Sequence, residues 1–229
     1  MDWWQAVDIY CERTGPGFWA EPFNAVSNLA FPAAALWAGI EARRRHPAKP
    51  IVWILICMAA LIGLGSFLFH TYATVWAGFA DTLPIWSFVA VFVGTAMHRI
   101  GGVKPGRIGV IALAAVALVV VLTLGAGDGS DGVVAAPDPL NGSGQYTPAM
   151  LALLAFTALT FWRRHPARHW ILAATLTFAV SLTLRTVDLA VCLNFPTGTH
   201  FAWHMLNGVM IGLLLQMLVR TPANRTVPS

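Results

Sequence analysis

Three histidines embedded in apolar sequence could together hold a metal ion. His200 and His204 are four residues apart in "THFAWHMLNG", so a helix would carry both on one face, one turn apart. His70 ends another apolar run, "LGSFLFH". Three imidazoles with a fourth position left for water form the ligand set of a catalytic zinc, which activates water and polarises carbonyl groups. Each histidine could instead be a hydrogen-bonded packing residue, and spacing alone leaves both interpretations open.

Ser66 and Asp81 lie close to His70 in the chain and carry groups that hydrolysis uses. Ser66 precedes His70 by four residues and would share its helical face, where its hydroxyl could donate to a developing oxyanion. Asp81 opens the next apolar segment and could orient or deprotonate a zinc-activated water. Ionisable groups in lipid-spanning sequence are costly, so they usually mark a functional site.

The elements that must position these residues are membrane helices. The 229-residue chain is 57% hydrophobic and 10% charged, whereas soluble domains carry about 25% charged residues. Most of its apolar segments reach the ~17 residues that a helix needs to cross lipid. We therefore predict an all-α, polytopic membrane protein whose seven transmembrane helices cover residues 24–42, 51–70, 78–97, 108–125, 147–162, 169–190 and 200–219.

Basic residues concentrate in alternate loops between these segments. Cytoplasmic loops of membrane proteins are enriched in Lys and Arg, so this alternation predicts an outer N-terminus and a cytoplasmic C-terminus. The same charges could also bind anionic lipid, and the net charge of +4 does not indicate nucleic-acid binding. The basic loop residues are Arg43, Arg44, Arg45 and Lys49; Arg99, Lys104 and Arg107; Arg163, Arg164 and Arg168; and Arg220 and Arg225.

This topology brings the candidate metal ligands to one depth. His70 would lie at the outer end of the second segment, Asp81 at the start of the third, and the histidine pair in the outer part of the seventh. We expect one domain over residues 1–221, with an outer segment 1–23, and a disordered tail at 222–229. The short loops favour a bacterial inner membrane with the metal site towards the periplasm; a eukaryotic endomembrane remains an alternative.

Three carboxylates precede the first apolar segment. Asp8, Glu12 and Glu21 are hard oxygen ligands of the kind that calcium prefers, although their spacing is not that of an EF-hand. A solvated acidic turn explains the same residues, and composition alone favours that simpler interpretation.

Three stretches of the sequence resemble the motif blocks of the alkaline ceramidases, which are related to the adiponectin receptors within a wider group of seven-helix metal hydrolases. These are "CERTGPGFWAEPFNAVSNL", "GLGSFLFHTYATVWAGFADTLPIW" and "RTVDLAVCLNFPTGTHFAWHMLNG". The resemblance implies zinc held by His70, His200 and His204, with Ser66 and Asp81 beside it. The reaction it implies is hydrolysis of the amide of ceramide to sphingosine and a fatty acid.

The resemblance also implies a calcium site in the N-terminal segment. Glu12 and Glu21 match the family's ligands through their neighbours in the motif. Asp8 lies one residue farther from Glu12 than the family aspartate, which leaves Tyr10 to provide a backbone carbonyl. Thr14 stands where the family has an asparagine, and the stretch to Glu21 is shorter. The implied calcium ligands are therefore Asp8, Tyr10, Glu12, Thr14 and Glu21.

Two further pairs are predicted to be structural. Arg185 and Asp188 are three residues apart in the sixth segment, where a buried ion pair is favoured over a role in substrate binding. Cys11 and Cys192 both fall on the predicted outer side. In an oxidising compartment, a disulfide between them could tie the N-terminal segment to the loop before the seventh segment.

The sequence thus predicts a zinc-dependent intramembrane hydrolase that cleaves ceramide or a related lipid amide. Its expected partners are the lipid substrate and the bilayer, with no nucleic acid and no obligate protein partner. Two alternatives remain: a receptor-like membrane protein with a structural zinc, and a transporter that relays protons or metal. The absence of an obvious pair of interrupted, symmetry-related helices disfavours the transporter.

Overall fold

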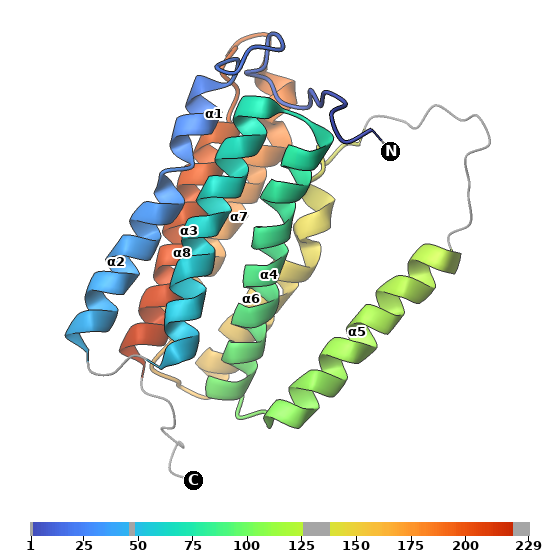
Figure 1. Ribbon diagram of the computed structural model, residues 1–229. Coiled ribbons are helices and arrows are strands. Elements are labelled where there is room, and N and C mark those ends of the chain that lie inside the picture. The colour runs from blue at the N-terminus through green and yellow to red at the C-terminus, as the bar shows by residue number, and fades with distance from the viewer. Residues whose placement is uncertain (1, 46–48, 126–137, 222–229) are drawn as a thin grey trace.

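A computed structural model of the protein describes residues 2–45, 49–125 and 138–221, which form a helical bundle (Figure 1). The predicted tail at 222–229 lies outside these residues. In the described part there is no β-strand, only an isolated antiparallel bridge between Ala6 and Thr74. The helices are α1 (Pro22–Ser27), α2 (Ala30–Arg44), α3 (Pro50–Tyr72), α4 (Val75–Arg99), α5 (Pro105–Gly125), the short 3₁₀ helix η1 (Ser143–Tyr146), α6 (Thr147–Trp162), α7 (Arg168–Val191) and α8 (His200–Arg220).

Five helical stretches are long and apolar enough to cross a membrane, which makes this a multi-pass membrane protein. They are Pro22–Arg44, which joins α1 to α2, and Pro50–Tyr72, Val75–Arg99, Arg168–Val191 and His200–Arg220. The other two predicted spans are also helices. However, α6 is only 16 residues long, and α5 offers a shorter apolar stretch, Pro105–Leu118. The all-helical fold is confirmed, whereas a topology of seven spans remains a prediction.

Local sequence sets several helix boundaries. Proline stands in the first turn of α1, α3 and α6, where its missing N–H costs no hydrogen bond. Helix α3 ends where Ala73 takes a left-handed conformation, with φ of 44°, and donates its N–H to the carbonyl of Phe69. This tight ending sends the chain directly into α4, so His70 and Asp81 come from adjacent helices at the same end of the bundle.

Helix α8 is the central element, because it packs against α2, α3 and α7. Glycines make the closest approach possible. A Cβ added to Gly208 would lie 2.5 Å from the Cβ of Ala30, so only a hydrogen at this position lets α8 lie this close to α2. Helix α5 differs, since among the helices it makes contacts chiefly with α4 and stands apart from the bundle in Figure 1.

The N-terminal segment folds over one end of the bundle. The N–H of Val7 donates to the carbonyl of Ala73 at 2.8 Å, and the N–H of Val75 donates to Gln5 at 3.1 Å. A disulfide joins Cys11 to Cys192, whose Cα atoms are 5.5 Å apart. This segment therefore covers the junction of α3 with α4 and the approach to α8.

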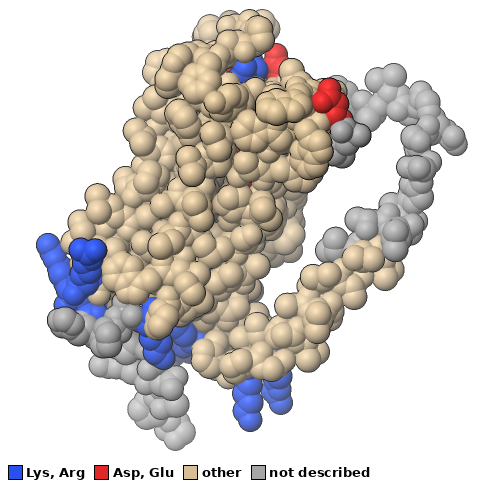
Figure 2. Space-filling model, viewed as in Figure 1, with Lys and Arg blue, Asp and Glu red and all other residues tan. Residues whose placement is uncertain are grey.

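Basic side chains gather at the opposite end (Figure 2). Arg43 and Arg44 lie in the last turn of α2, Arg99 ends α4, and Arg220 ends α8. Arg99 also donates to the carbonyls of Leu218 and Thr221 and so links the ends of α4 and α8. The separation of a basic end from the end covered by the N-terminal segment is what the positive-inside rule leads one to expect of a spanning bundle.

Adding one methyl group should test the close packing of α8. Gly208→Ala should destabilise the fold by about 1–3 kcal/mol, because the new Cβ must displace Ala30. Gly109→Ala in α5 is the matched control, since nothing lies within 4 Å of its added Cβ and alanine favours helix. Thermal unfolding in detergent measures both, and equal Tm values for the two variants would contradict the packing of α8 on α2.

Candidate metal centre

Three buried histidines meet at the end of the bundle that the N-terminal segment covers. His70 comes from the last turn of α3, and His200 and His204 come from the first two turns of α8. Their candidate ligand atoms all lie within 4.8 Å of one another, and the Nε2 atoms of His70 and His204 are 3.2 Å apart. Each side chain is at most 2% exposed. The structure thus brings together the three histidines that the sequence singled out.

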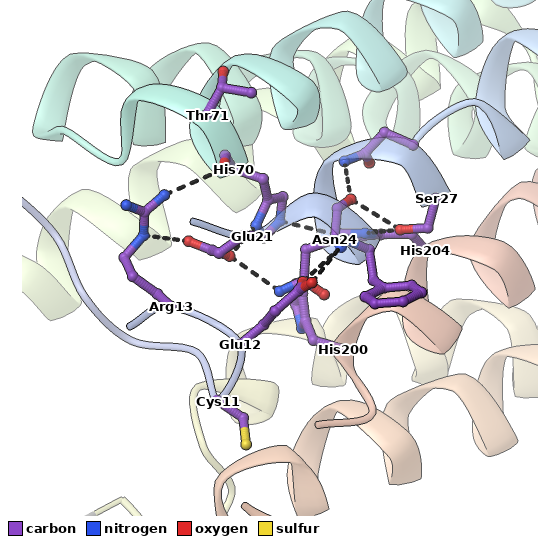
Figure 3. Close-up of polar contacts among 12 residues, drawn as sticks. Cys11, Glu12, Arg13, Glu21, Asn24, Ser27, His70, Thr71, His200 and His204 are labelled. Atoms are coloured by element: carbon purple, nitrogen blue, oxygen red, sulfur yellow. Dashed lines mark hydrogen bonds and ion pairs between the residues drawn. The ribbon is translucent and has the colours of Figure 1, made fainter. Parts of the chain in front are cut away.

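Glu21 holds the ring of His70. Its Oε2 lies 2.6 Å from Nδ1 of His70 (Figure 3). The carboxylate also pairs with Nε of Arg13 and accepts a 3.0 Å hydrogen bond from the amide of Asn24. Although burial opposes ionisation, these contacts with His70, Asn24 and Arg13 keep the pKa of Glu21 below its ordinary value. An ionised Glu21 accepts a hydrogen bond from Nδ1–H of His70, so the Nε2 lone pair faces the other histidines.

Ser27 holds the ring of His204 through a hydrogen bond with its Nδ1 atom. The hydroxyl of Ser27 donates its single proton to the carbonyl of Asn24 at 2.9 Å. Its contact with Nδ1 of His204, also 2.9 Å, must therefore be one in which the ring donates and the hydroxyl accepts. Nδ1 of His204 then carries the proton and Nε2 is free to bind a metal. Sequence spacing gave no signal for Ser27, because its partner is 177 residues away.

The histidine cluster fits a transition metal. Two nitrogens bound to one tetrahedral zinc at about 2.0–2.1 Å would be about 3.3 Å apart, close to the observed 3.2 Å between Nε2 of His70 and His204. Nδ1 of His200 is buried and has no hydrogen-bond partner among the described residues, so this ring has a nitrogen available for a metal. Among the described residues, no other group of His, Cys, Asp or Glu is gathered this tightly.

Ser66 and Asp81 line the same cavity as His200 and His204. Their side chains share a hydrogen bond, and Oδ1 of Asp81 is buried with no hydrogen-bond partner in the described part of the chain. Gly65 brings them together, because a Cβ there would lie 3.3 Å from the Cα of Asp81 and closer still to the carbonyl oxygen of Ala80. Helices α3 and α4 can approach this closely only because position 65 lacks a side chain.

A known protein family matches this chain, and its match agrees with the buried histidines, serine and aspartate described above. A family model described as Ceramidase matches residues 10–226 of the chain. The chain belongs to the ceramidase family. A search of curated proteins found no match. The match supports an amide hydrolase that acts on ceramide, a lipid substrate, and the resemblance seen in the three motif blocks is confirmed.

The ceramidase resemblance also implied calcium, and the N-terminal residues do not fit it. Both oxygens of Glu12 are engaged, since they accept the N–H groups of Phe23 at 2.7 Å and Asn24 at 2.8 Å and so cap α1. The carbonyl of Tyr10 accepts the N–H of Arg13, and Asp8 and Thr14 are exposed. Burial raises the pKa of Glu12 above its ordinary value, and these two backbone hydrogen bonds oppose that shift.

Arg13 provides a cation where the resemblance implied an ion (Figure 3). Its guanidinium pairs with Glu21 and donates to the carbonyls of Gly15 at 3.0 Å and His70 at 3.2 Å. These are the acceptors that a cation at this position would use. The sequence did not predict this role of Arg13, because Arg13 lies within the motif whose resemblance to the ceramidases implied calcium.

The predicted ion pair between Arg185 and Asp188 is wrong. Among the described residues, no ion pair joins them. Asp188 instead accepts the N–H groups of Cys11 at 3.1 Å, Thr199 at 2.7 Å and His200 at 2.9 Å. It therefore caps the N-terminus of α8 and fixes the backbone of His200.

Removing the hydroxyl of Ser27 should weaken metal binding. Ser27→Ala removes the hydroxyl that accepts a hydrogen bond from Nδ1–H of His204, and loss of such a partner typically lowers metal affinity about 10- to 100-fold. Competition with a chelator, followed by elemental analysis, measures the affinity. Thr183→Val is the control, because that hydroxyl contacts only a carbonyl of its own helix. Unchanged affinity in Ser27→Ala would contradict a role of this hydroxyl in metal binding.

Added calcium should not stabilise the fold of this protein, whereas the side chain of Arg13 should. We expect the same Tm with calcium and with a calcium chelator, since Arg13 already neutralises Glu21. Arg13→Met should lower the free energy of unfolding by about 3–5 kcal/mol, because it leaves a buried carboxylate without its cation. Arg45→Met, which breaks the exposed pair with Glu41, should change little. A rise in wild-type Tm on adding calcium would restore the calcium prediction.

Proposed function

We propose that the protein is a zinc-dependent intramembrane hydrolase that cleaves the amide of ceramide or a related lipid amide to a sphingoid base and a fatty acid. The observation that carries the proposal is the buried cluster of His70, His200 and His204 beside a cavity lined by Ser66 and Asp81. Membership of the ceramidase family supports the substrate class. Three neutral imidazoles are ligands of the kind that catalytic zinc sites use.

The shape and lining of the cavity support a lipid substrate. Apart from its polar end, the cavity is walled by apolar side chains from six helices, among them Phe31, Ile62, Phe88, Leu153, Phe178 and Leu214. Such walls suit alkyl chains, because each buried methylene contributes about 0.8 kcal/mol. The substrate would enter laterally from the bilayer, with its chains between helices and its amide at the polar end.

Asp81 and Ser66 would have different roles in hydrolysis, proton transfer and stabilisation of the oxyanion. His70, His200 and His204 would hold the zinc, which when bound would supply Lewis acidity to the amide carbonyl and to water. Asp81, whose Oδ1 has no hydrogen-bond partner among the described residues, accepts a proton from the attacking water and returns it to the nitrogen of the departing amine. Ser66 donates a hydrogen bond to the oxygen that gains negative charge. The apolar walls keep other water away from the amide.

We further propose that the histidine end faces the periplasm of a bacterial inner membrane. The basic end of the bundle, seen in Figure 2, is the end expected in the cytoplasm. The disulfide between Cys11 and Cys192 at the opposite end supports an oxidising compartment there.

Two variants separate metal binding from proton transfer. His204→Ala should lose both bound zinc and hydrolysis of ceramide, because it removes a ligand. Asp81→Asn should keep the zinc and lose about 10²- to 10⁴-fold in kcat, because the amide cannot accept the proton. Asp138→Asn is the control, since that carboxylate binds only the backbone of its own turn.

Mass spectrometry of the released fatty acid and elemental analysis measure the two effects. Hydrolysis that persists in His204→Ala would exclude the zinc mechanism. Full activity in Asp81→Asn with bound metal would remove Asp81 from the reaction and favour a structural metal.

A further inference from the structure

Arg185 is a buried cation whose hydrogen-bonding capacity is only partly used. Its side chain leaves α7 near the outer end and is 5% exposed. Nε and Nη1 have no hydrogen-bond partner among the described residues. An unsatisfied buried N–H is costly, and groups of this kind in native proteins call for an explanation. Asp188, the acceptor expected from sequence, is occupied by backbone N–H groups.

Aromatic rings surround the guanidinium and hold it in place. The Cζ atom lies 5.8 Å from the ring centre of Tyr10, 5.6 Å from that of Tyr146 and 5.7 Å from that of Trp203. The faces of these rings stabilise a positive charge. They do not replace the acceptors that Nε and Nη1 lack, so the cage fixes the cation while leaving its donors available.

This cage opens on a second, more polar cavity beside the reaction site. Arg185, Gln145 and Thr82 line it together with Asp81 and Tyr10. Asp81, Tyr10 and Tyr146 also line the apolar cavity that reaches His200 and His204. A lipid whose amide lies between Asp81 and the histidines would therefore have its chains in the apolar cavity and its polar end towards Arg185.

We propose that Arg185 binds a hydroxyl oxygen of the lipid head group and so selects amides of hydroxylated amines over amides of plain alkylamines. This inference rests on the proposed function. An uncharged oxygen is favoured over an anion because Asp81 lines the same cavity and balances the charge of Arg185. The head-group oxygen accepts the N–H groups that the protein leaves unpaired.

Two substrates with the same amide distinguish this role from a structural one. One is ceramide, and the other is a fatty amide of an alkylamine with the same chain lengths and no hydroxyl. Arg185→Gln should reduce kcat/KM about 10- to 100-fold on ceramide, as expected when hydrogen bonds to a charged group are lost, and change it little on the alkyl amide. Bound metal should stay at the wild-type level.

Arg220→Gln is the matched control, because Arg220 also lies over an aromatic ring, at 5.5 Å from Trp170, but at the basic end of the bundle. Arg185→Lys keeps a cation in the cage and provides the test if Arg185→Gln does not fold; its loss should also be confined to ceramide. Equal losses on both substrates, or a preference for a phosphorylated ceramide that depends on Arg185, would overturn the inference.

A binding measurement separates this inference from the proposed function. Zinc-loaded wild-type protein should bind sphingosine more tightly than an alkylamine of equal length, and Arg185→Gln should remove the difference. If the wild type hydrolyses neither amide but shows this preference, the proposed function fails while the role of Arg185 stands. No preference in the wild type would exclude the role of Arg185 even if ceramide is hydrolysed.

Discussion

The end of the bundle that holds the histidines depends on the hydrogen bonds and the ion pair made by the carboxylate of Glu21. It receives Arg13 from the N-terminal segment, Asn24 from α1 and His70 from α3. All of these groups are buried, so the loss of one partner would leave a buried polar group unsatisfied. One ionised side chain therefore anchors the N-terminal segment, fixes the start of α1 and sets the tautomer of a candidate metal ligand.

Hydropathy and spacing predicted the helices and the depth of the reactive residues, because both follow from local sequence. Five apolar stretches of spanning length are confirmed, and the HxxxH pair and His70 do meet. The partners of these histidines were not predictable in the same way. Ser27 and Glu21 reach the cluster through contacts that span 177 and 49 residues, and no periodicity reports such contacts.

The pairing of Arg185 with Asp188 shows why local spacing can mislead. An i,i+3 separation allows two opposite charges to meet, but it does not exclude stronger competitors. Three backbone N–H groups at the start of α8 and in the N-terminal segment reach Asp188 instead. Gly198, with φ of 61°, makes this possible, because a Cβ there would lie 2.6 Å from the Cβ of Cys11. The sequence shows that position 198 is a glycine, but it does not show how closely Cys11 and Asp188 approach that position.

The order in which the ligands occur along the chain has a consequence for biosynthesis. Glu21 lies near the start of the chain, His70 ends α3, and His200 and His204 belong to α8, the final helix of the described residues. A nascent chain still emerging from the ribosome thus lacks two of the three imidazoles until α8 has been inserted. The centre can be assembled only after that step, so products that stop before α8 cannot form it in the membrane.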